Sequence, residues 1–377
     1  MSRPENGAGP SYRPGQANGG TRASVRPGST EAPGHGIAIL VNANAKRGGR
    51  RVAVQLARAL PGASVRLTRR IEEIETWLRA LSAPRAILAA GGDGTAVALL
   101  NALRNVYGAP PFPPVGALPL GTGNAWAHVL GAHKLHGCVR ALARWPGPLP
   151  TRRYSLLECD DTLTFFAGSG WDAQVLDDYR MQIEQTKGPV RTLNKSVYGY
   201  LSAMLLRSAP KSILFGRPHV MIENLGDEVF TVDENRGLRK LEGVRRGAVL
   251  YEGMASVVGA ATCPEFGFRF RAYPFAERFP RLMNVRVYDQ STVRAIRDIP
   301  KLWRGEHPLE GMHDWFATHV RMTFSRPSPL QIAGEAVGQR QTVEYKAFPH
   351  EVDVVDWRGL YRDELPETLA GTRTIPP

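Results

Sequence analysis

Cysteines are scarce in this chain of 377 residues: it has only Cys138, Cys159 and Cys263. An odd number of cysteines, widely spaced and without a CxxC pair, argues against a disulfide framework and against a zinc site. No apolar run approaches the roughly 18–20 residues needed to cross a bilayer, and the amino terminus lacks the apolar core of a signal peptide. We therefore expect a cytoplasmic protein whose contact with lipid, if any, is peripheral.

Acidic residues are also few, with 35 Asp and Glu against 48 Lys and Arg, which gives a formal net charge of +13. Such an excess suits an anionic partner, which could be nucleotide phosphate, nucleic acid or an acidic membrane surface. No Lys/Arg cluster is interleaved with aromatic residues, so we expect no nucleic-acid partner. A basic surface exposed to solvent is the default explanation of the excess. The oligomeric state is left open.

The order of apolar segments predicts two domains and two tails. Residues 1–34 contain almost no large apolar side chain and are predicted to be a disordered tail. Short apolar runs at 37–41, 64–68, 85–90 and 115–120 alternate with helical patterns. That alternation is typical of a parallel sheet covered by helices on both faces, and it predicts an α/β domain over residues 35–149.

Beyond Pro150 the pattern changes to short segments in which apolar and polar residues alternate, at 266–271, 320–324 and 343–346. A helical pattern over 195–207 interrupts them. Residues 150–355 are therefore predicted to form a largely antiparallel β-sandwich, with residues 356–377 packing back on the first domain. A cleft between an α/β and a β domain is a common place for an active site.

Two glycine-rich loops carry the strongest chemical signal. Gly91-Gly92-Asp93-Gly94-Thr95 and Gly121-Thr122-Gly123-Asn124 each follow a predicted strand and open a helix. Such loops bring backbone N–H groups and a helix N-terminus to phosphate oxygens. A carboxylate such as Asp93 makes sense there if it holds Mg²⁺ or accepts a proton from a hydroxyl, although it could also cap the helix. The sequence has neither a GxGxxG fingerprint nor a Walker loop.

These loops also carry a family resemblance. The segments LVNANAKRGG, AILAAGGDGTAVALLNAL and VGALPLGTGNAWAHVLG resemble, in this order, the catalytic domain shared by diacylglycerol kinases, sphingosine and ceramide kinases and bacterial lipid kinases. FFAGSGWDAQV is similar to the family's segment entering the second domain. The run KLWRGEHPLEGMHDWFATHVRMTFSRPSPLQIAGE is similar to the approach to its Asp-Gly-Glu motif. The resemblance covers about residues 36–356.

The resemblance implies a lipid kinase that transfers the γ-phosphoryl group of ATP, with Mg²⁺, to the hydroxyl of diacylglycerol or of a sphingoid or ceramide lipid. ATP would lie between the two domains. Asp93 would be the catalytic and metal-binding carboxylate, and Glu335 a second catalytic group. The implied nucleotide-binding residues are Asn42, Lys46, Thr68, Gly91, Gly92, Gly94, Thr95, Gly121, Thr122, Gly123 and Asn124.

The chain departs from the family at three places. Ala333-Gly334-Glu335 stands where the family usually has Asp-Gly-Glu, and the Asp-Gly pair common after the Pro-rich strand is absent from ERFPRLMNVRV. Ala125 follows GTGN, as in the sphingosine and ceramide branch. These departures keep open a catalytically impaired protein that binds nucleotide or lipid. NAD kinase, which shares a GGDGT loop, is disfavoured by the presence of GTGN.

Other residues allow more than one interpretation from the sequence. Trp126 and Trp171 could line a pocket for an acyl chain, although ordinary core packing is the favoured interpretation of each. Asp172, Asp177 and Asp178 form an acidic cluster that could meet a lipid head group or lie in a solvated loop. His307, His313 and His319 recur at six-residue spacing, which is not that of a metal site on one helix face.

Overall fold

The structure is a computed structural model that describes residues 32–45, 49–145, 147–186, 202, 210, 216–233 and 235–362. Lys46, most of the predicted tail 1–34 and nearly all of the helix predicted over 195–207 lie outside these residues.

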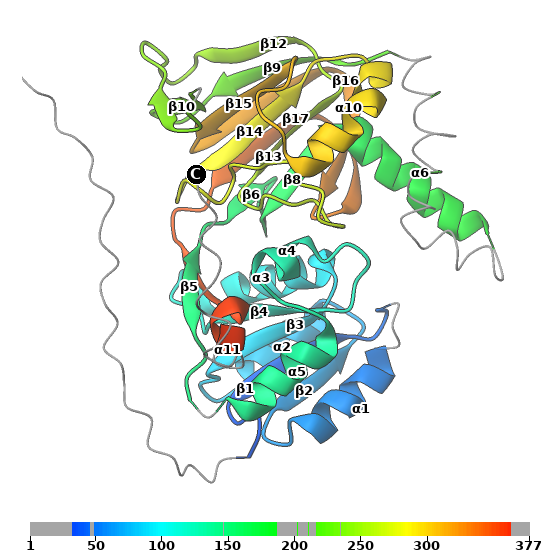
Figure 1. Cartoon of the computed structure of the whole chain (residues 1–377), viewed down its shortest axis with the longest axis vertical. Coiled ribbons are helices and arrows are strands. Elements are labelled where there is room, and N and C mark those ends of the chain that lie inside the picture. Colours follow the sequence, from blue (N-terminus) through cyan, green and yellow to red (C-terminus); the bar gives the residue numbers. More distant parts are fainter. Residues whose placement is uncertain are drawn as a thin grey trace, which may run out of the picture. The chain divides into compact units, whose positions relative to one another are not determined.

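The amino-terminal part is built on a six-stranded sheet (Figure 1). Its strands, in spatial order, are β2 (Ser64–Thr68), β1 (Ile37–Asn42), β3 (Ala86–Gly91), β4 (Val115–Pro119), β18 (Val352–Val355) and β5 (Thr151–Tyr154). The pairs from β2 to β18 are parallel, and β5 is antiparallel to β18. The central strands are buried on both faces, which explains why they are short continuous apolar runs.

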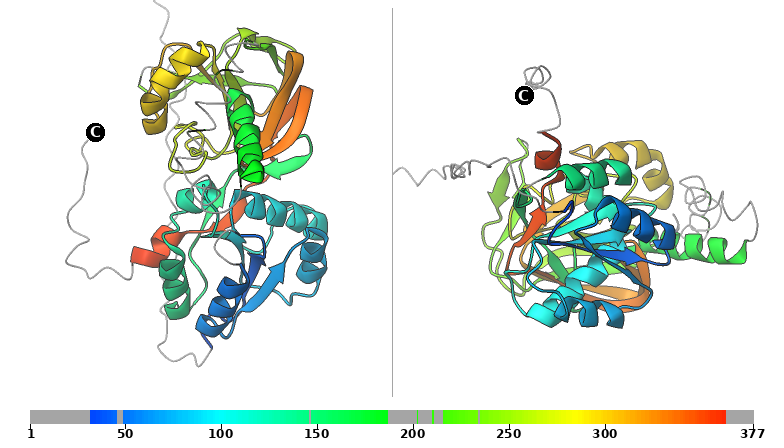
Figure 2. Two further views of the ribbon diagram at one scale, coloured as in Figure 1. Left: turned by 90° about the vertical axis from the view of Figure 1, so that its right-hand side faces the viewer. Right: turned by 90° about the horizontal axis from the view of Figure 1, so that it is seen from below.

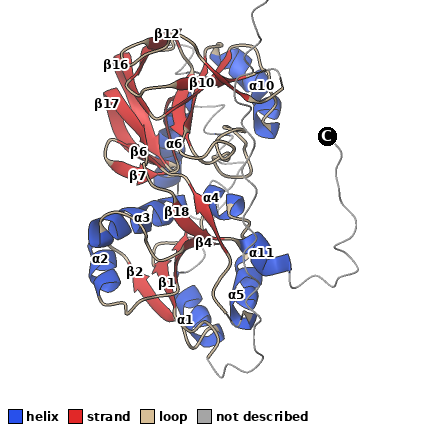
Figure 3. Ribbon diagram, turned by 90° about the vertical axis from the view of Figure 1, so that its left-hand side faces the viewer, coloured by secondary structure: helices blue, strands red, loops and turns tan. Residues whose placement is uncertain are grey.

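Helices cover both faces of this sheet, as predicted (Figures 2 and 3). On one face α2 (Glu72–Arg79) packs against α3 (Asp93–Tyr107). On the other, α1 (Gly49–Ala59) and α11 (Trp357–Arg362) both pack against α5 (Leu135–Arg144). The short helix α4 (Ala125–Val129) lies on β4.

Two strands of this sheet come from beyond Pro150. Both β5 and β18 fall within the segment 150–355 that was assigned to the β-sandwich, and together they complete the edge of the first sheet. The chain thus leaves the first sheet through β5 and returns to it through β18. The boundaries 35–149 and 150–355 stay a prediction.

The second part is a twelve-stranded sheet whose pairs are all antiparallel. Its strands are β6 (Leu157–Cys159), β7 (Thr162–Thr164), β8 (Phe166–Gly170), β9 (His219–Asn224), β10 (Val229–Val232), β11 (Leu238–Lys240), β12 (Val249–Met254), β13 (Val257–Ala261), β14 (Met283–Tyr288), β15 (Met312–Ala317), β16 (His319–Ile332) and β17 (Glu335–Ala347). Two described helices flank it, α6 (Trp171–Gln185) and α10 (Thr292–Arg304).

The long strand β16 lets this one sheet enclose a core. Its first half pairs with β9 through Val320–Phe324, and its last residues, Leu330–Ile332, pair with β8. As a result, Ile222 of β9, Val285 of β14 and Met322 of β16 belong to one buried apolar cluster. The predicted fold class, a parallel-sheet domain followed by a largely antiparallel β domain, is confirmed.

The strand predicted over 266–271 is wrong. These residues form a tight turn in which Phe266 N–H donates to the carbonyl of Phe270 (2.9 Å) and Phe270 N–H donates to that of Gly267 (2.8 Å). Gly267, Phe268 and Arg269 all have positive φ, which no extended strand allows. The other two alternating segments lie in β16 and β17.

Within the described residues, no helix combines the length and the apolar character that crossing a membrane requires.

Candidate functional site

The two glycine-rich loops meet at the carboxyl ends of the neighbouring strands β3 and β4. We call residues 91–95 and 121–124 together the glycine corner. A Cβ placed on Gly121 would lie 2.4 Å from the Cα of Gly92, and one on Gly91 would lie 2.1 Å from Thr95 Oγ1. Glycine is therefore required at both positions by the close approach of the chain, and the N–H of Gly121 donates to the carbonyl of Gly91 (3.0 Å).

The glycine corner lies beside the point where the strand order of the sheet reverses. Strand β1 lies between β2 and β3. The chain therefore adds β2 on one side of β1 and β3 on the other. In open α/β sheets ligands bind at the carboxyl ends of the strands at such a point. Asn42, at the end of β1, bridges it by donating from Nδ2 to Thr95 Oγ1 (3.0 Å).

Thr68 and Asn124 use their side chains locally. Thr68 is the register partner of Asn42 on β2, and its hydroxyl donates to the carbonyl of Arg70 (3.1 Å). Asn124 has φ of 53°, and its amide both accepts from Gly121 N–H (2.8 Å) and donates to the Gly121 carbonyl (2.9 Å). Asn124 therefore closes the second loop on itself, and any contact of these two side chains with nucleotide stays a prediction.

Asp93, the first residue of α3, ties the two loops together. Its Oδ1 accepts a hydrogen bond from the N–H of Trp126, and its Oδ2 accepts one from that of Ala125, each at 3.0 Å. Burial raises the pKa of this carboxyl to about 6, and the negative charge of Glu335 adds to the effect, while the two amides oppose it. The sequence left open that Asp93 caps the helix that follows its own loop. In the structure Asp93 does cap a helix, but that helix is α4.

Glu335 reaches the glycine corner from the β part of the molecule. It is the first residue of β17 and follows a two-residue turn, Ala333-Gly334, in which both φ angles are positive (49° and 78°). A Cβ placed on Gly94 would lie 3.1 Å from Glu335 Oε1. The structure therefore brings the two predicted catalytic carboxylates together, from positions 242 residues apart in the sequence.

The turn at 266–270 is a part of this site that the sequence did not reveal. Phe268 N–H donates to the carbonyl of Gly123 (3.3 Å), and a Cβ on Gly267 would lie 3.0 Å from the Cα of Gly123. Gly123 and Gly267 are 144 residues apart, so no pattern within either segment of the sequence predicts their contact. The one local sign is Gly267 itself, which stands among the aromatic residues.

A half-buried polar pair adjoins this turn. Glu265 Oε2 lies 3.8 Å from His128 Nδ1, and neither atom has a hydrogen-bond partner within the described part of the chain. Burial raises the pKa of Glu265 and lowers that of His128, because it disfavours the charged form of each. Asp93 contributes to the raised pKa of Glu265, so the pair belongs to the same electrostatic environment.

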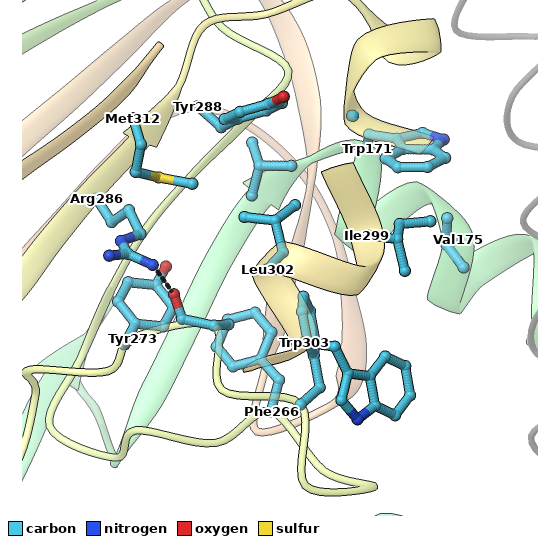
Figure 4. A pocket seen from close by; sticks show the side chains of 14 residues that line it. Trp171, Val175, Phe266, Tyr273, Arg286, Tyr288, Ile299, Leu302, Trp303 and Met312 are labelled. Carbon is cyan, nitrogen blue, oxygen red and sulfur yellow. Dashed lines mark hydrogen bonds between the residues drawn. The ribbon is translucent and has the colours of Figure 1, made fainter. Parts of the chain in front are cut away.

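An apolar pocket opens in the β part (Figure 4), with a volume of about 860 Å³ including the space open to solvent. Its walls come from α6, β13, β14, α10, β15 and the loop before β14. The lining residues are Trp171, Val175, Val257, Phe266, Phe270, Ala272, Tyr273, Arg286, Tyr288, Ala295, Ile299, Leu302, Trp303 and Met312. Of the two tryptophans considered for such a pocket, Trp171 lines it and Trp126 is fully buried beside Phe165.

The one cationic side chain among these lining residues is already neutralised. Arg286 forms a two-point ion pair with buried Asp314, with Nε–Oδ1 at 2.7 Å and Nη2–Oδ2 at 2.8 Å. It also donates to the carbonyl of Ala272. The pocket therefore offers hydrocarbon surface rather than an accessible charge, and a ligand of matching character would be an apolar chain.

Metal ligands do not cluster in the part of the chain that the structure describes, where no group of three or more His, Cys, Asp or Glu is arranged to hold an ion. The three histidines considered above face separate carboxylates: His307 faces Asp314 (3.8 Å), His313 faces Asp289 (2.8 Å) and His319 faces Glu344 (3.3 Å).

Comparison with known proteins agrees with this geometry. Two solved structures described as diacylglycerol kinases from Bacillus anthracis str. Sterne each share 14% identity with the chain and have a TM-score of 0.55. They cover 85% and 87% of this chain, and the matches span 96% and 98% of theirs. At this identity the likeness establishes the fold alone. No curated protein matches the chain. Residues 37–144 match the family model of the diacylglycerol kinase catalytic domain, which confirms the resemblance expected from the glycine loops and supports a kinase of this type.

Proposed function

We propose that this protein is a kinase that transfers the γ-phosphoryl group of ATP to the hydroxyl group of a lipid at a membrane surface. The match of residues 37–144 to a kinase catalytic domain supports phosphoryl transfer. The lipid acceptor rests on the structure of the β part, where an apolar pocket adjoins the glycine corner.

The turn at 266–270 is the observation that carries the proposal. Phe266 and Phe270 form part of the pocket wall, while Phe268 between them donates its N–H to Gly123 in the glycine corner. A lipid whose chain lies in the pocket would therefore present its polar end beside the glycine corner. A wholly water-soluble acceptor such as NAD would leave this apolar surface without a role.

The glycine corner supplies what phosphoryl transfer needs, which is mostly positioning and stabilisation of charge. The N-terminus of the fifteen-residue helix α3 and the loop backbone would hold the phosphates. The acceptor oxygen would form a bond to the γ-phosphorus as the bond to the bridging oxygen of ADP breaks. Asp93 would take the hydroxyl proton, for which a pKa of about 6 is well matched near neutral pH.

Two neighbouring carboxylates, Asp93 and Glu335, fit a Mg²⁺ ion brought in with the nucleotide. The negative charge of Glu335 raises the pKa of Asp93, so a cation held by these carboxylates would relieve a repulsion that the structure contains. Magnesium is commonly held by one or two carboxylates together with substrate phosphates. When bound, it would neutralise charge on the phosphate oxygens.

The test is transfer of labelled γ-phosphate from ATP to lipids in mixed micelles containing Mg²⁺. The panel holds diacylglycerol, monoacylglycerol, sphingosine and ceramide, with NAD as a soluble acceptor. Asp93→Asn is the inactive variant, and Asp227→Asn, at an exposed position of the β part, is its matched control. We expect one lipid to be labelled by the wild type and by Asp227→Asn.

Labelling of NAD alone would replace the lipid kinase by an NAD kinase. Binding of ATP without transfer to any acceptor would favour the catalytically impaired protein that the replacement at Ala333 left open.

A further inference from the structure

The backbone at the tip of the 266–270 turn is strained. Gly267 has φ of 107°, and the next two residues, Phe268 and Arg269, have φ of 50° and 61° although neither is glycine. The left-handed conformation is unfavourable for a residue that carries a Cβ. Such strain persists only where the surroundings impose it, and it is concentrated at functional sites.

The surroundings of this turn do impose its shape. Besides the two hydrogen bonds that close it, Arg271 N–H donates to the carbonyl of Trp303 (3.3 Å), and Arg286 donates to the carbonyl of Ala272. Phe266 packs against Phe166, with ring centroids 4.5 Å apart. Both ends of the turn are therefore anchored in the β part, while its tip is held against Gly123.

The tip lies close to the reacting groups of the proposed kinase. A Cβ on Gly123 would lie 3.4 Å from the Cα of Gly267 on one side and 3.5 Å from Asp93 Oδ2 on the other. The side chain of Arg269, the next residue but one after Gly267, is exposed at this tip. It also lies within electrostatic range of both Glu265 and His128.

The charge balance at this place calls for a cation. The negative charge of Glu335 acts on Asp93, that of Asp93 acts on Glu265, and the donor's phosphates would add further negative charge. Phosphoryl transfer is accelerated by an arginine that reaches the transferred group, since a guanidinium can contact two phosphate oxygens at once. Arg269 and Arg271 are the arginines that lower the pKa of Glu265, and Arg269 is the one at the tip beside Gly123.

We propose that Arg269 binds the terminal phosphate of the nucleotide and stabilises the phosphoryl group during its transfer, and that the strained turn exists to hold it there. This inference rests on the proposed kinase function. Arg269 forms no covalent bond and moves no proton: the new bond joins the acceptor oxygen to phosphorus, the bond to ADP breaks, and the hydroxyl proton goes to Asp93.

The test compares Arg269→Ala, Arg269→Lys and Arg271→Ala in steady-state kinetics with the lipid labelled in the panel. Arg271 is the matched control, because it lies in the same segment, is exposed and carries the same charge, but its Cβ faces Gly305. We expect Arg269→Ala to lower kcat by about 100-fold or more. Arg269→Lys should restore part of that loss, because it keeps the charge but not the two-point contact, and Arg271→Ala should stay within about threefold of wild type. Melting temperatures of the three variants should agree.

Titration with ATP and with vesicles separates the sources of phosphate. Weaker binding of ATP to Arg269→Ala, with unchanged binding to phosphatidylglycerol vesicles, supports the proposal. An effect on vesicle binding alone would mean that Arg269 binds a lipid phosphate and would overturn it, as would equal kinetics for the alanine variants at 269 and 271. If the wild type labels no lipid, the proposed function fails, and the ATP titration alone decides the role of Arg269.

Discussion

The glycine corner and the apolar pocket are built in opposite ways. The corner is made by backbone atoms of two loops that lie within 34 residues of each other, and at Gly91 and Gly121 it has no space even for a methyl group. The pocket is made by side chains spread from Trp171 to Met312 on several elements. A site that depends on close backbone approach needs particular residues, whereas a site that depends on apolar surface needs only side chains of suitable size.

The difference predicts different tolerance to substitution. Changes in the corner should abolish activity through the backbone or through one carboxylate. Changes in the pocket should alter how well the lipid binds and leave the nucleotide reaction intact, because cores and pockets tolerate apolar substitutions that keep the volume.

The largest effect is expected for Asp93→Asn. The carboxylate accepts from two N–H groups, but an amide can accept through its oxygen only, so its NH₂ group would face the N–H of Ala125 or Trp126. We expect kcat to fall by about 1,000-fold, since the proton acceptor is lost. We also expect a loss of about 1–3 kcal/mol in the free energy of unfolding, because a buried N–H loses its partner. Steady-state kinetics measures the change in kcat and thermal melting measures the change in stability, with Asp227→Asn as the control. Full activity in Asp93→Asn would mean that another residue is the catalytic base.

Gly121→Ala should have the next largest effect. The added methyl group would overlap the backbone of Gly92, which unlike a side chain has no other rotamer to adopt. We expect the two loops to be forced apart, with about 1–3 kcal/mol of destabilisation from overpacking and about a 100-fold loss of kcat. Gly147→Ala, where nothing lies within 4 Å of the added Cβ, is the control. Activity near that of the control would show that the corner is not as closely packed as the structure has it.

How far the sequence could predict each region follows from the same difference. The loops around Asp93 were predictable because strand, glycines and helix start are contiguous in the chain. The proximity of Glu335 to Asp93 followed from a family resemblance, since no local pattern links the first residue of α3 to the first residue of β17. The pocket left no motif, because each of its apolar residues also reads as ordinary core.

The turn at 266–270 was predicted wrongly for a physical reason. Phe266, Phe268 and Phe270 alternate with Gly267, Arg269 and Arg271, which is the period of a strand. The tertiary contact of the tip with Gly123 and the anchors at both ends decide the conformation instead, and a single sequence does not contain them.

A smaller effect is expected when the pocket is filled. Ala295, on α10, is 2% exposed and lines the pocket, so Ala295→Phe would occupy the space that the proposed lipid chain would fill. We expect the KM for the lipid to rise about 10-fold, with the KM for ATP unchanged. Leu302→Met, which keeps the volume, should leave both values near those of the wild type. A change in the KM for ATP in Ala295→Phe would mean that the two regions are not separate.

The pH dependence of activity should reveal Asp93 through a moderate effect. Because its pKa is raised to about 6, kcat should rise as the pH increases through that value and the base loses its proton. Stability should respond with the opposite sign. A carboxyl whose pKa is raised by folding favours the folded state at low pH, and this contribution is lost as the pH rises from about 4 to about 6. The control is Asp93→Asn, measured over the same pH range. If a group other than Asp93 titrates near pH 6, wild type and Asp93→Asn should show the same pH dependence of kcat and of stability.

Ala333→Asp should have the smallest effect, because two terms oppose each other. With φ of 49°, Ala333 occupies a left-handed conformation that Asp and Asn adopt more readily, which favours the substitution. However, Ala333 is 3% exposed, so a carboxylate there would lose hydration and would take up a proton more readily.

The control for this substitution is Ala83→Asp. Ala83 also has positive φ (40°) but is exposed, so Asp would gain from the left-handed conformation there without the cost of burying its carboxylate. We expect Ala83→Asp to raise the melting temperature slightly and Ala333→Asp to lie below it, with kcat within about threefold of wild type. A large rise in kcat for Ala333→Asp would instead show that the corner lacks a base, and that Asp93 serves mainly to hold the two loops together.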